Sequence, residues 1–589
     1  MCGIIGYIGN RRAAPILLKG LKHLEYRGYD SAGMATLSSR VEVRKDVGKI
    51  EDLEKRLRFE EMEGEVGIGH TRWATHGKVT KENAHPHFSQ NRKIYVVHNG
   101  IIENYQELRE FLKENGFNFY SETDTEVIPN LIQYEMERGK NFEEACKAAL
   151  KRLEGSFAVV IMHEGEEKLI AARRGSPLVI GVGDGEYFVA SDIPAFLEFT
   201  KKVIFMYDWD FAVITKNGVK FYNLREGKEV ERSIDVIDWD AEQAKKGEFK
   251  HYMIKEILEQ VETIQRAAMQ DESIVAAIVE EMRKARGIFF VGCGSSYHAC
   301  FAGSYIFSKV ANLHVNVMLA SEFPNFKHFL NENTLVFAVS QSGETADVLE
   351  AVRAAKEKGS KVISITNVRG SSITRYSDRF LLLNAGPEIC VLATKTYTSQ
   401  LALLTLLAYA YAGRYEEGRK RLRYLWNVVY NLTSRTSREM IKKLAERLKD
   451  EEHIFVIGRG LQYATALEAA LKIKEVSYIH AEAFAGGELK HGTIALIEDG
   501  TPCIVFVSEE NEKEIISNAV EIKSRGGYII GVSPKNNDVF DFWIKVPECD
   551  VANPIVQIIP IQILAYQLAV LRGYDPDKPR NLAKSVTVK

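Results

Sequence analysis

The chain has 589 residues, which at roughly 150 residues per domain suggests about four domains. Hydrophobic residues make up 46% of it and charged residues 27%, a composition that excludes a disordered, collagen-like or low-complexity protein. The 77 Lys and Arg residues nearly balance the 80 Asp and Glu residues, so the net charge of −3 excludes nucleic-acid binding through bulk charge.

Cysteine and hydropathy patterns indicate a reduced, cytoplasmic protein. The seven cysteines are scattered and form no CxxC pair, so neither a disulfide framework nor a zinc ribbon is predicted. No apolar run at the start is long enough for a signal peptide. The most apolar stretch, residues 555–571, carries Pro560 and three glutamines, and we expect it to fall short of a membrane span.

Residues 1–235 read as an α+β domain with antiparallel sheets. Short β-rich runs such as VGIGHTRWAT and KIYVVHNGII outnumber the helices, of which 104–115 and 124–137 have clear apolar faces. Residues 236–250 are charged and weakly periodic, so we interpret them as an interdomain linker. A helical stretch is predicted over 252–285.

The remainder contains an internal repeat. Residues 287–301 (GIFFVGCGSSYHACF) reappear as 453–467 (HIFVIGRGLQYATAL), and two further blocks recur at offsets of 166 to 168 residues. Each copy alternates buried strands with helical patterns, which predicts two doubly wound parallel-sheet domains, at 251–420 and 421–570, and a tail at 571–589. The serines of SQSGET become SEENEK in the second copy, so we expect the first copy to hold the ligand.

Cys2 is the first candidate nucleophile. If Met1 is removed, the thiol and a free α-amine share one residue, and an amine with a pKa near 8 can act as the base for its own side chain. The alternative is a buried cysteine that happens to be second in the chain.

Three further segments supply groups that suit acyl transfer. Asn99 and Gly100 offer an amide and a backbone N–H for an oxyanion hole. Arg72 and Asp124 match the carboxylate and ammonium of an amino-acid substrate. As alternatives, Asp124 also suits an N-cap for the following helix, and Trp73 suits a core position.

A phosphate site is predicted at residues 340–345. Three hydroxyls and a glycine follow an apolar strand and precede a helix (346–358), where backbone N–H groups favour an anion. An ordinary Ser/Thr capping turn is the alternative. The parallel turn at 293–296 carries Ser296.

The residues around Lys472 and Lys584 do not by themselves assign a function to either lysine. Lys472 and Glu475 lie three residues apart in a helical stretch, 464–479, and read as a surface ion pair worth about 0.5 kcal/mol or less. Lys584 lies close to the end of the chain among Leu, Ala and Val residues, which favours a docked tail over a frayed one.

Taken together, the motifs MCGIIGYIG, LEYRGYDSAG, HTRWATHG, HNGIIENY and SETDTE resemble the class II glutamine amidotransferase domain. With the tandem repeat and the tail PRNLAKSVTV, the whole chain resembles the isomerising glutamine–fructose-6-phosphate aminotransferase family. The resemblance implies a four-layer αββα N-terminal-nucleophile domain followed by two α/β sugar-isomerase (SIS) domains.

The resemblance also implies roles in the N-terminal domain. Cys2 attacks glutamine, Arg72 and Asp124 hold its α-carboxylate and α-ammonium, and Asn99 with Gly100 forms the oxyanion hole. Three residues have secondary roles: Arg27 orients the amine and thiol, Trp73 gates ammonia passage, and His76 shapes the pocket.

For the sugar half, the implied fructose 6-phosphate contacts are Ser296, Ser340, Gln341, Ser342 and Thr345. Glu475 would shuttle the proton beside Lys472, His491 would open the ring, and Lys584 would form a Schiff base with the ketose. The segment 391–393 reads Val-Leu-Ala where the family usually has Val-Ala-Ser, so a serine contact is missing at Ala393.

The implied reaction converts fructose 6-phosphate and glutamine to glucosamine 6-phosphate and glutamate, by a homodimer, with no metal or other cofactor. We interpret His85 and His87 as structural because they lack carboxylate or cysteine partners at ligand spacing. Three alternatives remain: action on another sugar phosphate, a non-catalytic sugar-phosphate sensor, and a simple glutaminase.

Overall fold

The computed structural model describes residues 2–74, 76–237 and 246–587. Contacts divide the chain into two units. The first comprises residues 1–245 with 344–346 and 583–589, and the second comprises 246–343 and 347–582. Residues 238–245 of the predicted linker lie outside the described residues.

The first unit is built on two antiparallel sheets. Among the described residues, one sheet has eight strands in the order β15-β11-β9-β10-β1-β4-β2-β3, and the other has seven in the order β14-β13-β12-β8-β7-β6-β5. The predicted antiparallel α+β class is therefore confirmed. The strands are β1 (Gly3–Ile8), β2 (Ser31–Leu37), β3 (Val41–Val47), β4 (Val66–Arg72), β5 (His87–Phe88), β6 (Ile94–Ile102), β7 (Gly155–His163), β8 (Glu166–Arg174), β9 (Val179–Val182), β10 (Tyr187–Ala190), β11 (Lys202–Phe205), β12 (Asp210–Thr215), β13 (Gly218–Asn223), β14 (Glu229–Val230) and β15 (Asp235–Val236).

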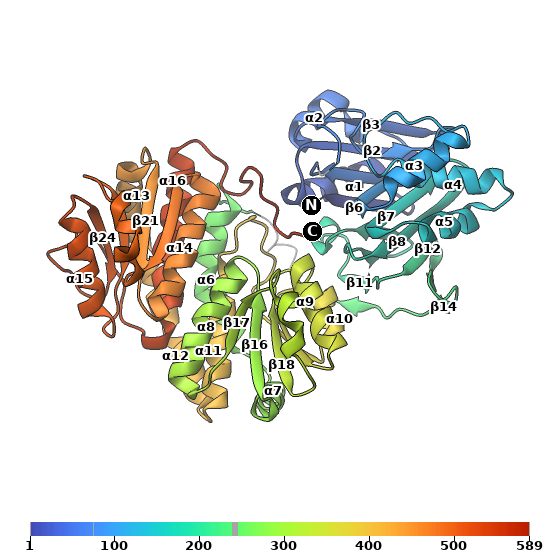
Figure 1. Ribbon diagram of the computed structural model, residues 1–589. Coiled ribbons are helices and arrows are strands. Elements are labelled where there is room, and N and C mark those ends of the chain that lie inside the picture. The colour runs from blue at the N-terminus through green and yellow to red at the C-terminus, as the bar shows by residue number, and fades with distance from the viewer. Residues whose placement is uncertain (1, 75, 238–245, 588–589) are drawn as a thin grey trace. The chain divides into compact units, whose positions relative to one another are not determined.

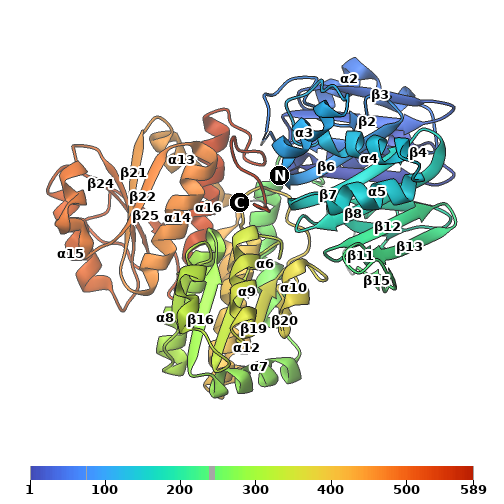
Figure 2. The ribbon, with the colours of Figure 1, turned by 45° about the vertical axis from the view of Figure 1, so that its right-hand side comes forward.

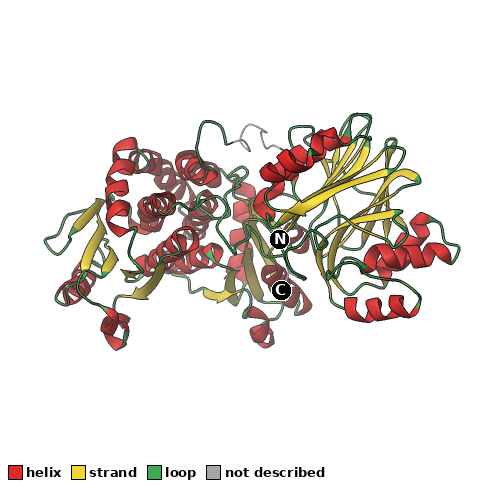
Figure 3. Ribbon diagram, turned by 90° about the horizontal axis from the view of Figure 1, so that it is seen from above, coloured by secondary structure: helices red, strands yellow, loops and turns green. Residues whose placement is uncertain are grey.

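Helices cover the outer face of each sheet, which gives the four layers seen edge-on in Figure 3. The helices are α1 (Ala13–Leu24), α2 (Ile50–Leu57), α3 (Tyr105–Glu114), α4 (Val127–Glu137) and α5 (Phe142–Lys151). One apolar cluster joins α1 to the first sheet, a second joins α3, α4 and α5 to the other, and a third lies between the sheets. The prediction that a helix begins at residue 124 was early by three residues.

The layer between the sheets follows the strand alternation. Side chains at Ile4 and Ile8 of β1, Ile68 of β4 and Val97 of β6 all belong to the inter-sheet cluster. Alternate residues of a strand point to the same face, so the next members of these series are Cys2, His70 and Asn99. The apolar layer therefore ends in polar side chains from three strands at one end of the sheets.

The second unit contains two parallel sheets with the same strand order. Within the described residues these are β17-β16-β18-β19-β20 and β22-β21-β23-β24-β25, so the predicted repeat is confirmed. The strands are β16 (Gly287–Gly292), β17 (Asn316–Leu319), β18 (Thr334–Val339), β19 (Lys361–Thr366), β20 (Arg379–Leu382), β21 (His453–Gly458), β22 (His480–Ala485), β23 (Pro502–Phe506), β24 (Tyr528–Ser533) and β25 (Phe542–Lys545).

Both sheets carry helices on their two faces (Figures 1 and 2). One large apolar cluster joins α6, α8, α11, α14 and α16 to the inner faces, and two smaller ones lie under α9 and α15. The helical stretch expected at 252–285 is two helices, α6 and α7. The helices are α6 (Tyr252–Ala268), α7 (Glu272–Lys284), α8 (Ser295–Ala311), α9 (Ala346–Glu357), α10 (Ser372–Tyr376), α11 (Lys395–Tyr411), α12 (Tyr415–Leu432), α13 (Arg435–Leu448), α14 (Leu461–Ser477), α15 (Glu512–Lys523) and α16 (Asn553–Leu571).

The two glycines in each copy of the repeat have different structural roles. A Cβ at Gly292 would lie 2.9 Å from the backbone of Ser296, and one at Gly458 would lie 2.2 Å from the carbonyl oxygen of Gln462. These glycines therefore let the following helix approach the strand. Gly294 and Gly460 precede α8 and α14 with φ of 54° and 57°, a left-handed conformation that favours glycine.

Helix α16 corrects an expectation about the most apolar segment. Residues 550–571 are long and apolar enough to cross a membrane by length and composition, despite Pro560, and no other helix among the described residues passes that test. However, 83% of the apolar window is buried inside the protein, as in the core helix of a compact domain.

Candidate active site

In the first unit Cys2 is held by the backbone of Trp73. The Cys2 thiol donates to the Trp73 carbonyl oxygen at 3.4 Å, and the Trp73 N–H donates to Cys2 Sγ at 3.2 Å. Burial raises the pKa of the Cys2 thiol, although the Trp73 N–H and the Arg72 charge act in the opposite direction. The thiol therefore needs a base to become a nucleophile at neutral pH.

Asn99 and Gly100 follow each other on β6, with Asn99 beside Cys2. The Asn99 side-chain Nδ2 donates to the Cys2 carbonyl oxygen at 2.8 Å. Gly100 has φ of +134°, and a Cβ there would lie 2.0 Å from the Ser156 carbonyl oxygen. Only glycine fits this position, because both the backbone angle and the neighbouring strand exclude a side chain.

Arg72 is almost fully buried at the end of β4. Its guanidinium donates to the backbone carbonyl oxygens of His76, Gly77 and Lys78, the last two at 3.2 Å. Asp30 also holds this loop, because its Oδ2 accepts the Ala74 N–H at 2.9 Å. Asp30 was not predicted from sequence, although it lies in the quoted motif LEYRGYDSAG.

Asp124 does not cap the helix that follows it. Its Oδ2 accepts the Ile102 N–H at 2.9 Å, and the N-cap residue of α4 is Glu126. The alternative N-cap interpretation is therefore wrong. The bond instead fixes Asp124, which is buried, against the end of β6, two residues after Gly100.

Trp73 and His76 lie on the loop after β4 and are half-buried. Their rings meet Tyr29 and Tyr105 edge-on, at 5.5 Å and 5.6 Å between centroids. Trp73 is therefore neither a core residue nor fully exposed, and the core interpretation is wrong.

Arg27 is buried and pairs with Asp192. Its Nη1 lies 2.5 Å from Asp192 Oδ2, which also accepts the Tyr26 hydroxyl. Nothing in the sequence near residue 192 predicted this ion pair, because the two residues are far apart along the chain.

In the second unit the 340–343 turn folds onto itself after β18. Ser340 Oγ accepts the Gly343 N–H at 3.1 Å, and the Gln341 carbonyl oxygen accepts the Asn367 N–H at 3.0 Å. Gly343 has φ of +66° and lies against Ser371, where a Cβ would come within 2.2 Å of the hydroxyl. Ser342 is half-buried in this turn, and Thr345 directly precedes α9.

The neighbouring serines of α8 differ in their contacts. Ser296 Oγ accepts from Gln400 Nε2 at 3.0 Å, so it joins α8 to α11. Ser295 instead donates to Glu468 Oε1 at 2.8 Å and accepts from Lys472 Nζ at 3.1 Å. Ser295 lies in the predicted turn 293–296, although only Ser296 was named there as a sugar contact, and it lies closer than Ser296 to the charged groups of α14.

Lys472 is the centre of a buried charged network. It is 0% exposed, and its Nζ lies 2.7 Å from Glu475 Oε2 and 3.4 Å from Glu468 Oε1. Burial alone would lower the pKa of Lys472, but Glu475 and Glu468 outweigh it and raise the pKa. The prediction of a surface ion pair is therefore wrong.

Glu468 completes the network and was missed by the sequence analysis. It is 0% exposed, and its Oε2 lies 2.8 Å from His298 Nδ1. Burial raises the pKa of Glu468, but the charges of Lys472 and His298 lower it overall. The signal was available, because positions 468, 472 and 475 recur on one helical face.

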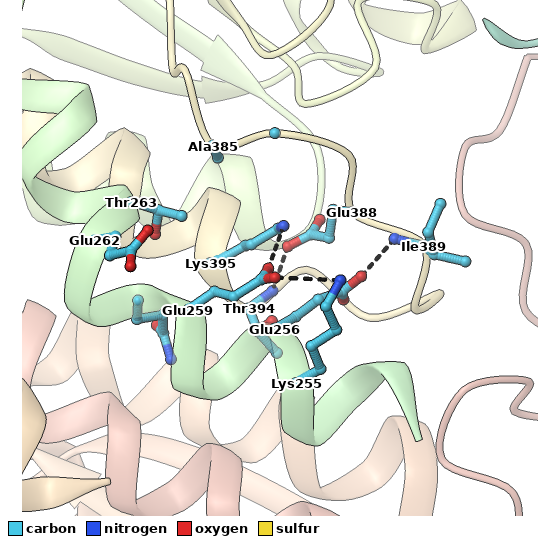
Figure 4. Close-up of polar contacts among 12 residues, drawn as sticks. Lys255, Glu256, Glu259, Glu262, Thr263, Ala385, Glu388, Ile389, Thr394 and Lys395 are labelled. Atoms are coloured by element: carbon cyan, nitrogen blue, oxygen red, sulfur yellow. Dashed lines mark hydrogen bonds and ion pairs between the residues drawn. The ribbon is translucent and has the colours of Figure 1, made fainter. Parts of the chain in front are cut away.

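Glutamate side chains hold the loop between β20 and α11, as Figure 4 shows for Glu388 and Glu256. Glu388 accepts the N–H groups of Thr394 and Thr396 at 3.0 Å and 3.1 Å, and Glu256 of α6 accepts that of Ile389 at 2.6 Å. The loop thereby presents the Ala393 carbonyl oxygen to Lys472 Nζ at 3.3 Å. This contact is made by the backbone of Ala393 and not by a side chain.

Two further residues were predicted for the sugar site, His491 and Lys584. His491 is exposed at the end of the short helix Glu488–His491, and no hydrogen bond of the described residues joins it to Lys472 or Glu475. Lys584 is half-buried in a segment without regular secondary structure that groups with the first unit.

Comparisons with known proteins agree with this division. The glutamine amidotransferase domain family matches residues 70–198, and the SIS domain family matches 281–410 and 447–572. A glutamine–fructose-6-phosphate aminotransferase (isomerising) of Thermococcus kodakarensis is 48% identical over 602 residues, and one of Caldanaerobacter subterraneus is 45% identical over 613 residues. Each alignment covers 100% of both chains.

Among solved structures, the C-terminal domain of glucosamine-fructose-6-phosphate aminotransferase from Francisella tularensis is similar to this chain with a TM-score of 0.53 and 34% identity. The match covers 57% of this chain and 100% of that domain.

Proposed function

The chain belongs to the isomerising glutamine–fructose-6-phosphate aminotransferase family, and from that premise we propose how its residues divide the reaction. The overall reaction transfers the amide nitrogen of glutamine to fructose 6-phosphate, giving glucosamine 6-phosphate and glutamate. The first unit releases ammonia from glutamine, and the second unit uses it.

In the first half-reaction Cys2 Sγ attacks the side-chain carbonyl carbon of glutamine. A C–S bond forms, the C–N bond breaks, and the thiol proton leaves with the ammonia; water then cleaves the thioester to glutamate. The burial that raises the pKa of Cys2 supports a role for its own α-amine, free after removal of Met1, as the base. Asn99 Nδ2 and the Gly100 N–H stabilise the oxyanion.

The glutamine itself is held by charge. Arg72 binds its α-carboxylate and Asp124 its α-ammonium, and both are buried near the end of the inter-sheet layer. Arg27 supports this end of the site through Asp192. His76 shapes the pocket, and Trp73 controls the passage of ammonia.

In the second unit the sugar phosphate binds at the carboxyl ends of the parallel strands. The phosphate is received by the turn of Ser340, Gln341 and Ser342 with Thr345 at the start of α9, and Ser296 supports the sugar. Lys584 forms a Schiff base with the open-chain ketose, and His491 opens the ring as an acid–base group.

Glu475 moves the proton from C1 to C2 of the ketose, and Lys472 holds that carboxylate in place through an ion pair. The single observation that carries this assignment is the complete burial of Lys472 with two carboxylates beside it. Because the Lys472 pKa is raised, this ammonium acts as a fixed positive charge and not as a proton donor.

We further infer a cytoplasmic homodimer that needs no metal. The family resemblance supports the dimer, and size-exclusion chromatography with light scattering tests it. A second candidate substrate, another ketose phosphate, is favoured by one observation: the contact at Ala393 is made by a backbone oxygen that already accepts from Lys472.

The decisive assay measures glutamate and glucosamine 6-phosphate in the same tubes, with and without fructose 6-phosphate. We expect sugar-stimulated glutamate release with equal amounts of both products. Glutamate without amino sugar would indicate a simple glutaminase or another ketose, and a panel of sugar phosphates would separate the two. Mass spectrometry of the N-terminus establishes that Met1 has been removed.

A further inference from the structure

His70 joins the two sheets of the first unit immediately behind Asn99. It lies on β4, opposite Ile4 of β1, and its side chain is 0% exposed. Its Nε2 lies 3.0 Å from Asn99 Oδ1 and 3.0 Å from the His98 carbonyl oxygen, both on β6 of the other sheet. The side chain therefore spans the inter-sheet layer at the point where its apolar residues end.

These contacts permit one arrangement of hydrogens. The His98 carbonyl oxygen only accepts, so His70 Nε2 carries the proton, and Asn99 must turn its Oδ1 toward that N–H. The Asn99 NH2 group then faces the Cys2 carbonyl oxygen, 2.8 Å away. If the Asn99 amide were rotated by 180°, its oxygen would face the Cys2 carbonyl oxygen and its NH2 group would face the N–H of His70. Neither pair could form a hydrogen bond.

The surroundings keep His70 neutral and fixed. The ring of His85 stacks on it at 4.0 Å, and His85 Nδ1 in turn accepts the His98 N–H at 3.3 Å. Burial lowers the pKa of His70 to about 3, so one ring nitrogen stays unprotonated at neutral pH. His70 Nδ1 is buried with no hydrogen-bond partner in the described structure, which agrees with a single proton on Nε2.

An amide NH2 group has two N–H bonds. The Cys2 carbonyl oxygen accepts one, and the other is the bond that a developing oxyanion would accept. We propose that His70 is a positioning residue for glutamine hydrolysis, which sets the Asn99 amide so that its NH2 group and not its oxygen meets the reacting carbonyl. This inference rests on the proposed role of Asn99 and deepens it.

The test compares two isosteric replacements in the full-length protein. In His70→Gln the side-chain amide nitrogen reaches the place of Nε2, whereas in His70→Asn it reaches only the place of Nδ1. We expect kcat for glutamine hydrolysis to stay within about fivefold of wild type for His70→Gln. We expect it to fall about 30- to 100-fold for His70→Asn, with KM for glutamine changed less than about threefold.

A double-mutant cycle separates positioning from a general structural effect. Asn99→Ala should lower kcat about 100-fold or more, and His70→Asn added to Asn99→Ala should lower it no further. The rate of Cys2 alkylation by iodoacetamide should stay within about twofold of wild type in every variant, since the thiol contacts Trp73 and not His70.

Each outcome has a distinct meaning. Equal kcat values for His70→Gln and His70→Asn, or effects that multiply with Asn99→Ala, would overturn the positioning role. A kcat unchanged by Asn99→Ala would instead overturn the proposed oxyanion hole. If wild type releases no glutamate with Met1 removed, the proposed function itself fails.

Discussion

The two candidate sites are built from opposite kinds of polar network. In the first unit, Cys2, Asn99 and His70 are joined by hydrogen bonds between neutral groups at the end of an apolar layer. In the second unit, Lys472 is completely buried between two carboxylates. The groups that contact the Cys2 backbone carbonyl are therefore neutral, whereas the groups that contact Lys472 include charged carboxylates.

The difference follows from what each proposed reaction needs. Acyl transfer to a thiol develops negative charge on one oxygen, and fixed neutral dipoles can meet it without being reorganised. Proton transfer at a ketose needs a carboxylate that can take up a proton away from water. A neighbouring positive charge such as Lys472 offsets the desolvation cost of burying such a carboxylate. The predictions below test this contrast, beginning with the largest effect.

Replacing the thiol should separate chemistry from stability. Cys2→Ala should reduce glutamate release by more than about 10⁴-fold, because no other group in the proposed site forms the thioester. A coupled glutamate assay measures the loss, and thermal unfolding should be unchanged. Cys549→Ala, a half-buried cysteine of the second unit, is the matched control and should keep wild-type activity. Comparable activity in both variants would rule out Cys2 as the nucleophile.

Removing the buried charge in the second unit should cost stability as well as activity. Lys472→Met leaves Glu468 and Glu475 without their cation, so we expect a loss of about 3–5 kcal/mol together with loss of glucosamine 6-phosphate formation. Calorimetric unfolding measures the first and product assay the second. Lys474→Met changes an exposed lysine on the same helix and should alter stability by less than about 0.5 kcal/mol. A stable, active Lys472→Met would contradict the charged network.

Acid should weaken the neutral network. The His70 pKa is lowered to about 3 from a usual 6.5, so the unfolded chain binds a proton there that the folded chain does not as pH falls below 6.5. Stability is therefore lost as pH falls, by about 2 kcal/mol from His70 alone between pH 8 and pH 5. Urea unfolding at both pH values measures the slope, which His70→Gln should reduce. A slope that the substitution leaves unchanged would show that His70 is already exposed to protons in the folded state.

The smallest expected effect separates two adjacent serines. Ser296→Ala removes the hydrogen bond from Gln400 and should cost about 1 kcal/mol in stability. Ser308→Ala, at an exposed position of the same helix, is the control. Ser295→Ala should instead change the pH dependence of product formation, because Ser295 bonds both Glu468 and Lys472. If Ser296→Ala alone shifts that pH dependence, the assignment of the two serines is reversed.

Much of the fold was predictable because its signals are local. The repeat at 287–301 and 453–467 gave the two parallel sheets, since the GxG turns serve the same backbone purpose in both copies. The strand pattern of residues 1–235 gave the antiparallel sheets. Motif residues Cys2, Trp73 and Asn99 were also found together.

The sequence could not predict which residues from distant segments of the chain contact each other in the folded protein. Lys472 looked like a surface lysine because α8, which covers it, lies more than 150 residues earlier in the chain. His70 was interpreted only as part of the HTRWATHG motif. Its contact with Asn99 joins β4 of one sheet to β6 of the other, which the local sequence does not indicate. Asp124 suited an N-cap locally, but Ile102 takes its carboxylate. In each case a tertiary contact decided the outcome over a local preference.

The position of β1 has a consequence during synthesis. Although it is the first strand of the chain, β1 is an inner strand, paired with β4 on one side and with β10 on the other. Its second partner ends at Ala190, and at about 5–20 residues per second the ribosome takes on the order of 10–40 seconds to reach it. Throughout that interval one edge of β1 has no partner. If Met1 is removed within that interval, as the proposed role of the Cys2 α-amine allows, the removal takes place on an unfinished sheet, and a slowly translated stretch before residue 190 would lengthen the interval.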